Sequence, residues 1–332
     1  MKTIAFFNNK GGVGKTSLVY HLAWMFAECG LNVLAMDLDP QANLTAMFLD
    51  EDRLEQLWSD DDDHPLTVFG AIRPILRGLG DISQPHVEKL SPNLGLIPGD
   101  LGLSRFEDKL SDSWPRCHNY DEAAFRTMTA FHRLALQGGQ WGADVALIDV
   151  GPNLGAINRA ALIASDQVVV PLGADLFSLQ GLKNLGPTMR EWRSIWQELL
   201  PKGPSDLAMP KGLMAPMGYV VSQHGIRETR TVKSYQRWVA RVPFVYRTSV
   251  LGEHADCVPE PENDPHALAM LKHYRSLMPM AMDARKPMFS LRSADGAIGS
   301  HIEAVRTCYT DFLQLARRIA TQADLSLAEY DV

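Results

Sequence analysis

The sequence predicts an α/β protein with three layers, in which a mostly parallel, twisted sheet is covered by helices on both faces. Short apolar runs alternate with helical stretches along the 332 residues, as expected of a parallel sheet with crossover helices. These runs are continuously apolar, which is typical of strands buried on both faces. The first strand, helix and second strand follow one another at the spacing of a βαβ unit.

The expected elements follow in chain order. A first strand covers 3–8, a glycine-rich turn 11–14, a helix 16–29 and a second strand 31–36. Later strands are expected at 94–97, 145–148, 167–171 and 217–221, and a last long helix at about 299–322. We expect a single domain over 1–332, with loop insertions near 50–66, 200–216 and 255–295. The first insertion is acidic and is expected to be a solvated loop.

Composition excludes several classes of protein. The formal net charge is −7, from 32 basic and 39 acidic side chains, so any binding to DNA requires a local basic patch. The four cysteines are far apart, which argues against a zinc site, an iron–sulfur site or a disulfide scaffold. No run of 18 or more apolar residues is present, so no membrane span is expected.

A glycine-rich loop between the first strand and the first helix predicts binding of nucleotide phosphates. Its residues are Lys10, Gly11, Gly12, Val13, Gly14, Lys15, Thr16 and Ser17. The glycines let backbone N–H groups turn toward phosphate oxygens. Lys15 would reach the β- and γ-phosphates, and the Thr16 hydroxyl would ligate magnesium. The loop therefore predicts a P-loop NTPase fold that uses ATP and Mg2+.

Acidic residues end two of the predicted strands, where the carboxyl edge of a parallel sheet meets the phosphates. Asp37 and Asp39 follow the second strand, and Asp149 follows the strand at 145–148 in a Walker B pattern. Asp149 would hold a magnesium-bound water. Gly151 follows closely and could offer its N–H group to the γ-phosphate.

Lys10 stands directly before the paired glycines, while Asn9 occupies the place of the usual first glycine. Lys-Gly-Gly-Val-Gly-Lys-Thr resembles the deviant Walker A motif of the ParA/MinD family, and residues 37–43 resemble that family's Asp-x-Asp-Pro-Gln-x-Asn segment. The resemblance implies that Lys10 crosses a dimer interface to the partner's nucleotide. It also implies that Asp39 orients or activates the attacking water, with Asp37 supporting the magnesium shell and Lys10. Lys10, Lys15 and Asp39 are therefore the expected catalytic residues.

A second segment carries the same resemblance. Residues 166–181 are similar to the family's Pro-x-x-x-Glu-x-x-x-Leu-x-Gly stretch, with Asp175 and Gln180 in place of the usual glutamates. In the family this stretch helps to form the dimer face and the nucleotide pocket. We therefore expect an ATP-sandwich homodimer.

A basic row in the C-terminal half is the candidate DNA-binding surface. Arg230, Lys233, Arg237 and Arg241 are spaced three, four and four residues apart, so on a helix they would share one face. Such a row neutralises phosphates without reading base sequence. A solvated helix face is the alternative interpretation, and Trp238 is expected to pack inward.

The resemblance is greatest to ParA-type partition ATPases in which no DNA-binding domain precedes the phosphate loop. It implies a slow, partner-stimulated ATPase that binds DNA non-specifically and works with a ParB-like or other cargo-adaptor protein. The expected location is the cytoplasm of a prokaryote, in association with the nucleoid. The cargo, whether DNA or a protein assembly, stays open.

Two alternatives use the same scaffold. A MinD-like membrane ATPase needs a basic amphipathic tail, whereas the segment 324–332 carries three acids and no lysine or arginine. An ATP-dependent metabolic ligase needs a substrate pocket, which an assay with candidate acids would reveal. We therefore expect no membrane partner.

Overall fold

One sheet organises the part of the chain that the computed structural model describes. That part is residues 1–332 without 61–62, 223–231, 255–256, 273, 275 and 329–332, and without the side chains of 232–235. Within it, eight strands lie in the order β3-β4-β2-β5-β1-β6-β7-β8, and only β3 and β4 pair antiparallel. The strands are β1 (Lys2–Phe6), β2 (Val33–Asp37), β3 (Glu88–Ser91), β4 (Leu94–Ile97), β5 (Val145–Asp149), β6 (Gln167–Gly173), β7 (Ala215–Ser222) and β8 (Ala267–Leu271).

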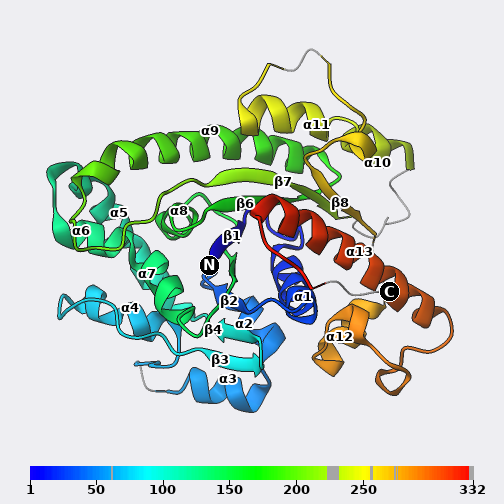
Figure 1. Cartoon of the computed structure of the whole chain (residues 1–332), viewed down its shortest axis with the longest axis horizontal. Helices are drawn as coiled ribbons and strands as arrows, with labels where there is room; N and C mark the ends of the chain where they lie inside the picture. The colour runs from blue at the N-terminus through cyan, green and yellow to red at the C-terminus, as the bar shows by residue number, and fades with distance from the viewer. Residues whose placement is uncertain (61–62, 223–231, 255–256, 273, 275, 329–332) are drawn as a thin grey trace.

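Helices cover both faces of this sheet, so the predicted three-layer α/β architecture is confirmed (Figure 1). One face carries α4 (Val68–Arg77), α5 (Phe106–Arg116), α6 (Glu122–Met128), α7 (Ala130–Gly138), α8 (Ala156–Ile163), α9 (Leu176–Leu199), α10 (Val232–Val239) and α11 (Val242–Val245). The other carries α1 (Lys15–Glu28), α2 (Asn43–Phe48), α3 (Glu51–Leu57), α12 (Leu277–Ala284) and α13 (Ser300–Ala323).

The apolar runs are continuous because successive side chains of a strand enter the cores on opposite faces of the sheet. On β1, Ile4 and Phe6 belong to the core cluster under α1 and α13, whereas Ala5 belongs to the cluster on the opposite face. Successive strand side chains point to opposite faces, so a strand covered on both sides needs apolar residues at every position. None of the helices in the described part of the chain has the length and hydropathy needed to cross a bilayer.

Two stretches differ from the sequence-based expectation. The acidic stretch 50–66 is partly helical, because the Asp50 carboxylate accepts the Arg53 N–H at 2.8 Å and caps α3. Glu51 and Asp52 occupy the first turn, where the helix dipole favours acids. The stretch 255–295 contains the helical piece that its sequence suggests, α12, and also the edge strand β8, which was not predicted.

Candidate nucleotide-binding site

The phosphate loop, Lys10 to Ser17, joins the turn after β1 to the first residues of α1 (Figure 1). The backbone is left-handed at Gly12 and Gly14, with φ of 71° and 86°. A Cβ atom at Gly12 would meet nothing within 4 Å, so backbone conformation rather than crowding requires glycine there. No side chain caps α1 among the described residues, which leaves its first-turn N–H groups to an anion.

The Lys15 ammonium lies inside the site. Lys15 is 7% exposed, and its Nζ donates a hydrogen bond to the Lys10 carbonyl oxygen at 3.3 Å. Burial lowers the pKa of Lys15, and the carboxylates of Asp149 and Asp39 oppose that change. The two acids therefore favour the charged form of the Lys15 ammonium, which faces the phosphate loop.

Asp37 ends β2 and its carboxylate is fully satisfied. Oδ2 accepts hydrogen bonds from the N–H and the hydroxyl of Thr45, each at 2.8 Å, and Oδ1 accepts one from the Asp39 N–H at 3.3 Å. The Gly99 N–H, which follows β4, donates to the Thr45 hydroxyl at 2.7 Å. Burial raises the pKa of Asp37 to about 7, against the effect of the bonds from Thr45. Asp37 thus ties α2 and the loop after β4 to the sheet.

Asp149 ends β5 beside Asp37, with which it is paired in register, and it is also fully buried. Neither of its carboxylate oxygens has a well-formed hydrogen bond among the described residues, although the Thr16 hydroxyl is near enough to act on the carboxyl group. Burial, and next the Asp37 carboxylate, raise the pKa of Asp149 well above its usual range, while the Thr16 hydroxyl and the Lys15 ammonium act in the opposite direction. A buried acid without a partner is costly unless a ligand engages it.

The residues around Asp149 fit a magnesium ion. The Asp149 carboxylate and the Thr16 hydroxyl supply the hard oxygen ligands that Mg2+ prefers. No three His, Cys, Asp or Glu side chains of the described residues are grouped to hold a metal by themselves. Protein sites for Mg2+ often supply only one or two carboxylates and leave the other positions to phosphates and water.

Lys10 is held by a residue of its own chain. Its Nζ lies 2.5 Å from Asp175 Oδ2 and 3.4 Å from the Ser178 hydroxyl, at the start of α9. Asp175 also caps α9, because its Oδ1 accepts the Ser178 N–H at 2.9 Å. In this structure the acid that pairs with Lys10 is therefore Asp175, and not Asp37 as expected.

The segment after Asp149 is fixed at both ends. Asn158 Nδ2 donates to the carbonyl oxygens of Gly151 at 2.8 Å and Asn153 at 2.7 Å. Glu107, on α5, accepts the N–H groups of the first two residues of α8 at 2.5 and 2.9 Å. A Cβ atom at Gly151 would lie 3.3 Å from Asp39 Oδ1, so this segment packs directly on the expected catalytic acid.

The candidate DNA-binding row is described only in part. Arg230 lies outside the described residues, and of Lys233 only the backbone, in α10, is described. Arg237 and Arg241 are exposed, and each guanidinium carbon lies 5.4 Å from the centre of the Trp238 ring. Trp238 packs against the core, as predicted.

From the sequence, Asp175 was named only as a departure from the family's stretch, and Thr45 and Glu107 were not identified. Asp175 had a local signal, because an aspartate three residues before Ser178 at the start of a helical stretch is typical of an N-cap. Thr45 and Glu107 had none, since they reach their partners through contacts made by the folded chain.

Comparison with known proteins shows what this chain is similar to. A sequence model of the AAA_31 family, described as an AAA domain, matches residues 1–200. Protein IncC of Escherichia coli is 35% identical over 193 residues, which are 58% of this chain and 47% of IncC. Soj, a sporulation initiation inhibitor protein of Bacillus subtilis, is 30% identical over 237 residues, which are 71% of this chain and 80% of Soj.

A chromosome partitioning protein ParA of Caulobacter vibrioides is 30% identical over 193 residues, 58% of this chain and 64% of that protein. This chain therefore matches less than two thirds of the length of IncC and of that ParA. The ATP complex of a single-residue variant of McdA from Cyanothece covers 99% of this chain and 99% of its own, with a TM-score of 0.63 at 17% identity. That likeness confirms the P-loop fold.

Proposed function

This chain belongs to the AAA_31 family, in the ParA/MinD group of deviant Walker A P-loop ATPases, and we propose that it is an ATP-driven switch that partitions or positions a cargo. ATP would join two chains into a sandwich homodimer, and that dimer would bind DNA non-specifically. A ParB-like or other cargo-adaptor protein would stimulate a slow hydrolysis. The proposed location is the nucleoid of a prokaryotic cell.

The observation that carries the proposal is the buried Asp149 carboxylate without a partner, beside a phosphate loop whose first-turn N–H groups are uncapped. Lys15 would hold the β- and γ-phosphates through its partly desolvated ammonium. Thr16 and Asp149 would hold Mg2+, which when bound neutralises phosphate charge. The McdA structure holds ATP, and the relatives named for partitioning support the cargo role.

Asp39 would orient the attacking water and accept its proton. Its side chain is 7% exposed, its Oδ1 accepts the Gln41 N–H at 3.0 Å, and it lies against Gly151. Two further contacts hold the Gly151 segment, namely those of Asn158 and Glu107. The N–H group of Gly151 would then meet the γ-phosphate on the side where Asp39 acts.

The dimer face would form around Lys10. Leu176 and Phe177, directly after its partner Asp175, are 51% and 69% exposed, and Leu154 in the segment after Asp149 is 36% exposed. Exposed apolar side chains beside a nucleotide site favour contact with a second chain. In such a dimer Lys10 would exchange Asp175 for the phosphates of the partner's nucleotide and act as an arginine finger does.

Size measurement with nucleotides tests the switch. The parent chain and Lys10→Ala are sized with ATP, ADP or no nucleotide, and their ATPase rates are measured. We expect a dimer with ATP for the parent and a monomer for Lys10→Ala, with ATP affinity retained because Lys15 remains. If ATP never yields a dimer of the parent, the sandwich proposal fails.

DNA retention at increasing salt tests the basic row. Arg237→Glu with Arg241→Glu should abolish salt-sensitive retention of the ATP-bound protein while ATP binding persists. Arg306→Glu with Arg317→Glu is the matched control, since these exposed residues of α13 lie on the opposite face of the sheet. Equal loss in both double variants would assign the effect to net charge and overturn this surface.

A further inference from the structure

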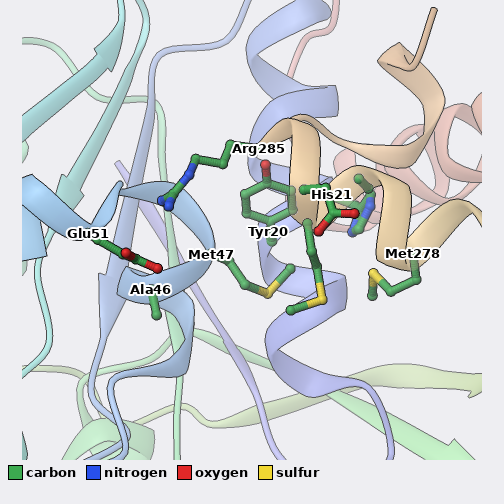
Figure 2. A pocket seen from close by; sticks show the side chains of 10 residues that line it. Tyr20, His21, Ala46, Met47, Glu51, Met278 and Arg285 are labelled. Carbon is green, nitrogen blue, oxygen red and sulfur yellow. The ribbon is translucent and has the colours of Figure 1, made fainter. Parts of the chain in front are cut away.

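A pocket lies between the helices that leave the nucleotide site and the segment that follows β8 (Figure 2). Its volume is about 390 Å³, within the range of roughly 300–1,000 Å³ that small-molecule sites occupy. The walls come from α1, α2, the first residue of α3, and α12 with the residue that ends it. No residue of this pocket belongs to the nucleotide site described above.

Thioether side chains form much of the apolar wall. Met47 comes from α2, and Met278 and Met282 come from α12; Figure 2 shows Met47 and Met278 on opposing sides of the pocket. Met282 is 61% exposed. Methionine is unbranched and polarisable, so such walls adapt to apolar groups of different shape.

Two carboxylates at this pocket have no partner. Glu51 and Asp283 are exposed and make no hydrogen bond or ion pair with any described residue. Figure 2 shows the Glu51 side chain turned toward the pocket. Arg285 supplies a single positive charge against these two acids, and its guanidinium donates to the carbonyl oxygen of Leu49. The pocket therefore presents an excess of negative charge above an apolar wall.

Arg285 also fastens the pocket together. It ends α12 with a φ of 50°, a left-handed conformation that costs a non-glycine residue free energy. The bond from its guanidinium to Leu49, where α2 ends, joins α12 to α2 and compensates for that conformation. This bond therefore links the two methionine-bearing walls.

The two walls formed by α1 and α2 also contact residues of the nucleotide site. On α1, His21 Nδ1 donates to the Ser17 carbonyl oxygen at 2.7 Å, and its Nε2 accepts the Met288 N–H at 3.1 Å. On α2, Met47 lies two residues after Thr45, which holds Asp37. A ligand that presses on these walls would therefore shift elements that carry the phosphate loop and its acids.

We propose that this pocket binds a small organic cation with an apolar stem, an alkylamine or alkylguanidine, and that its occupation changes nucleotide affinity. Glu51 and Asp283 would hold the cation, while the methionines would cover the stem. Binding itself is independent of the proposed function. The coupling rests on that function, since it requires that ATP or ADP binds at the phosphate loop.

Hexylguanidinium chloride is the probe, and the methyl resonances of 13C-labelled methionine are the readout. We expect saturable shifts at Met47, Met278 and Met282, and none at Met128 and Met189, which lie in the core on the other face of the sheet. Neutral n-hexanol should bind about tenfold more weakly. No saturable shift up to roughly 10 mM, or equal binding of n-hexanol, would overturn the proposal.

Substitution of the two acids tests the recognition. Glu51→Gln with Asp283→Asn should weaken hexylguanidinium binding about tenfold, without loss of fold because both side chains are exposed. Asp112→Asn, an exposed acid of α5 without a partner among the described residues, is the control and should change nothing. Unchanged binding by the double variant would remove the acids from the site and overturn the assignment.

Nucleotide affinity measured with and without saturating hexylguanidinium tests the coupling. We expect a change of about fivefold or more for ATP or ADP, with the same factor in the affinity for hexylguanidinium. Specific methyl shifts without any change in nucleotide affinity would overturn the proposed effect on the nucleotide site. The proposal that the pocket binds the cation would then still stand. If neither nucleotide binds, the proposed function fails, while the methyl shifts still decide whether the pocket binds the cation.

Discussion

Asp37 and Asp149 end adjacent strands at paired positions and are both fully buried, yet their surroundings differ. Asp37 accepts three hydrogen bonds, which hold α2 and the loop after β4 in place. Asp149 accepts none from the described residues. The fold therefore satisfies the carboxylate that has a structural task and leaves unsatisfied the one that faces the phosphate loop. Such unmet groups mark places where stability is given up for ligand binding.

Asp149→Asn is the substitution for which we expect the largest effect, and it tests the difference between the two acids. ATP hydrolysis should fall about 10²–10³-fold, because an amide cannot replace the charge that the acid supplies. The nucleotide-free variant should nevertheless unfold with a free energy about 1–2 kcal/mol higher, since an amide is less costly to bury than an unpaired acid. ATPase assays and denaturant unfolding measure both. A variant with parental activity, or with lower stability, would contradict the interpretation of Asp149.

His21 extends the comparison to a fully satisfied buried base. Burial lowers its pKa to about 4, while in the unfolded chain a histidine titrates near 6.5. The folded state thus binds fewer protons than the unfolded chain. The free energy of unfolding that neutral His21 contributes is therefore complete above about pH 6.5 and is lost as the pH falls toward about 4. The loss amounts to at most about 3 kcal/mol. Unfolding measured from pH 7 to pH 4 should show it in the parent and not in His21→Gln; equal pH slopes would contradict this.

Thr45→Val should destabilise the chain by about 2 kcal/mol. The valine keeps the shape but removes the hydroxyl, which leaves an Asp37 oxygen and the Gly99 N–H without one of their bonds. Thr45→Ser retains the hydroxyl and is the matched control, expected to cost less than half as much. Denaturant unfolding checks the order, and equal losses in both variants would show that the methyl group, not the hydroxyl, matters.

Glu107→Gln should have the smallest effect, about 1 kcal/mol. One of its oxygens becomes an amide N–H group that faces a backbone N–H at the start of α8, so one bond is lost. Because the Gly151 segment leads into α8, we expect weaker binding of ATP and little change for ADP. Asp108→Asn, an exposed neighbour on α5, is the control. Equal weakening of ATP and ADP would indicate a general loss of stability instead.

The sheet and the phosphate loop could be predicted from the sequence because local patterns of neighbouring residues indicate both. Lys15 and Thr16 follow three glycines, and the four residues before Asp37 and the four before Asp149 are all apolar. The partners of these groups could not be predicted in the same way. Thr45 reaches Asp37 and Glu107 reaches α8 only after the chain has folded, and no local pattern encodes such contacts.

The edge strand β8 was missed for a related reason. Its five residues, Ala267–Leu271, are too few to separate strand from helix by periodicity, and Pro265 stands just before them. Pairing with β7 decides the outcome, and that is a contact between distant segments. The basic row stays a prediction, since Arg230 and the Lys233 side chain lie outside the described residues.

The bond between Lys10 and Asp175 also bears on the free energy of the proposed dimer. A partner carboxylate on the same chain acts at an effective concentration in the millimolar range or above, independent of how much protein is present. An acceptor from a second chain would have to compete with this carboxylate for the Lys10 ammonium. In the proposed dimer, Lys10 would therefore move to the partner's nucleotide only if the phosphates bind its ammonium more strongly than Asp175 does.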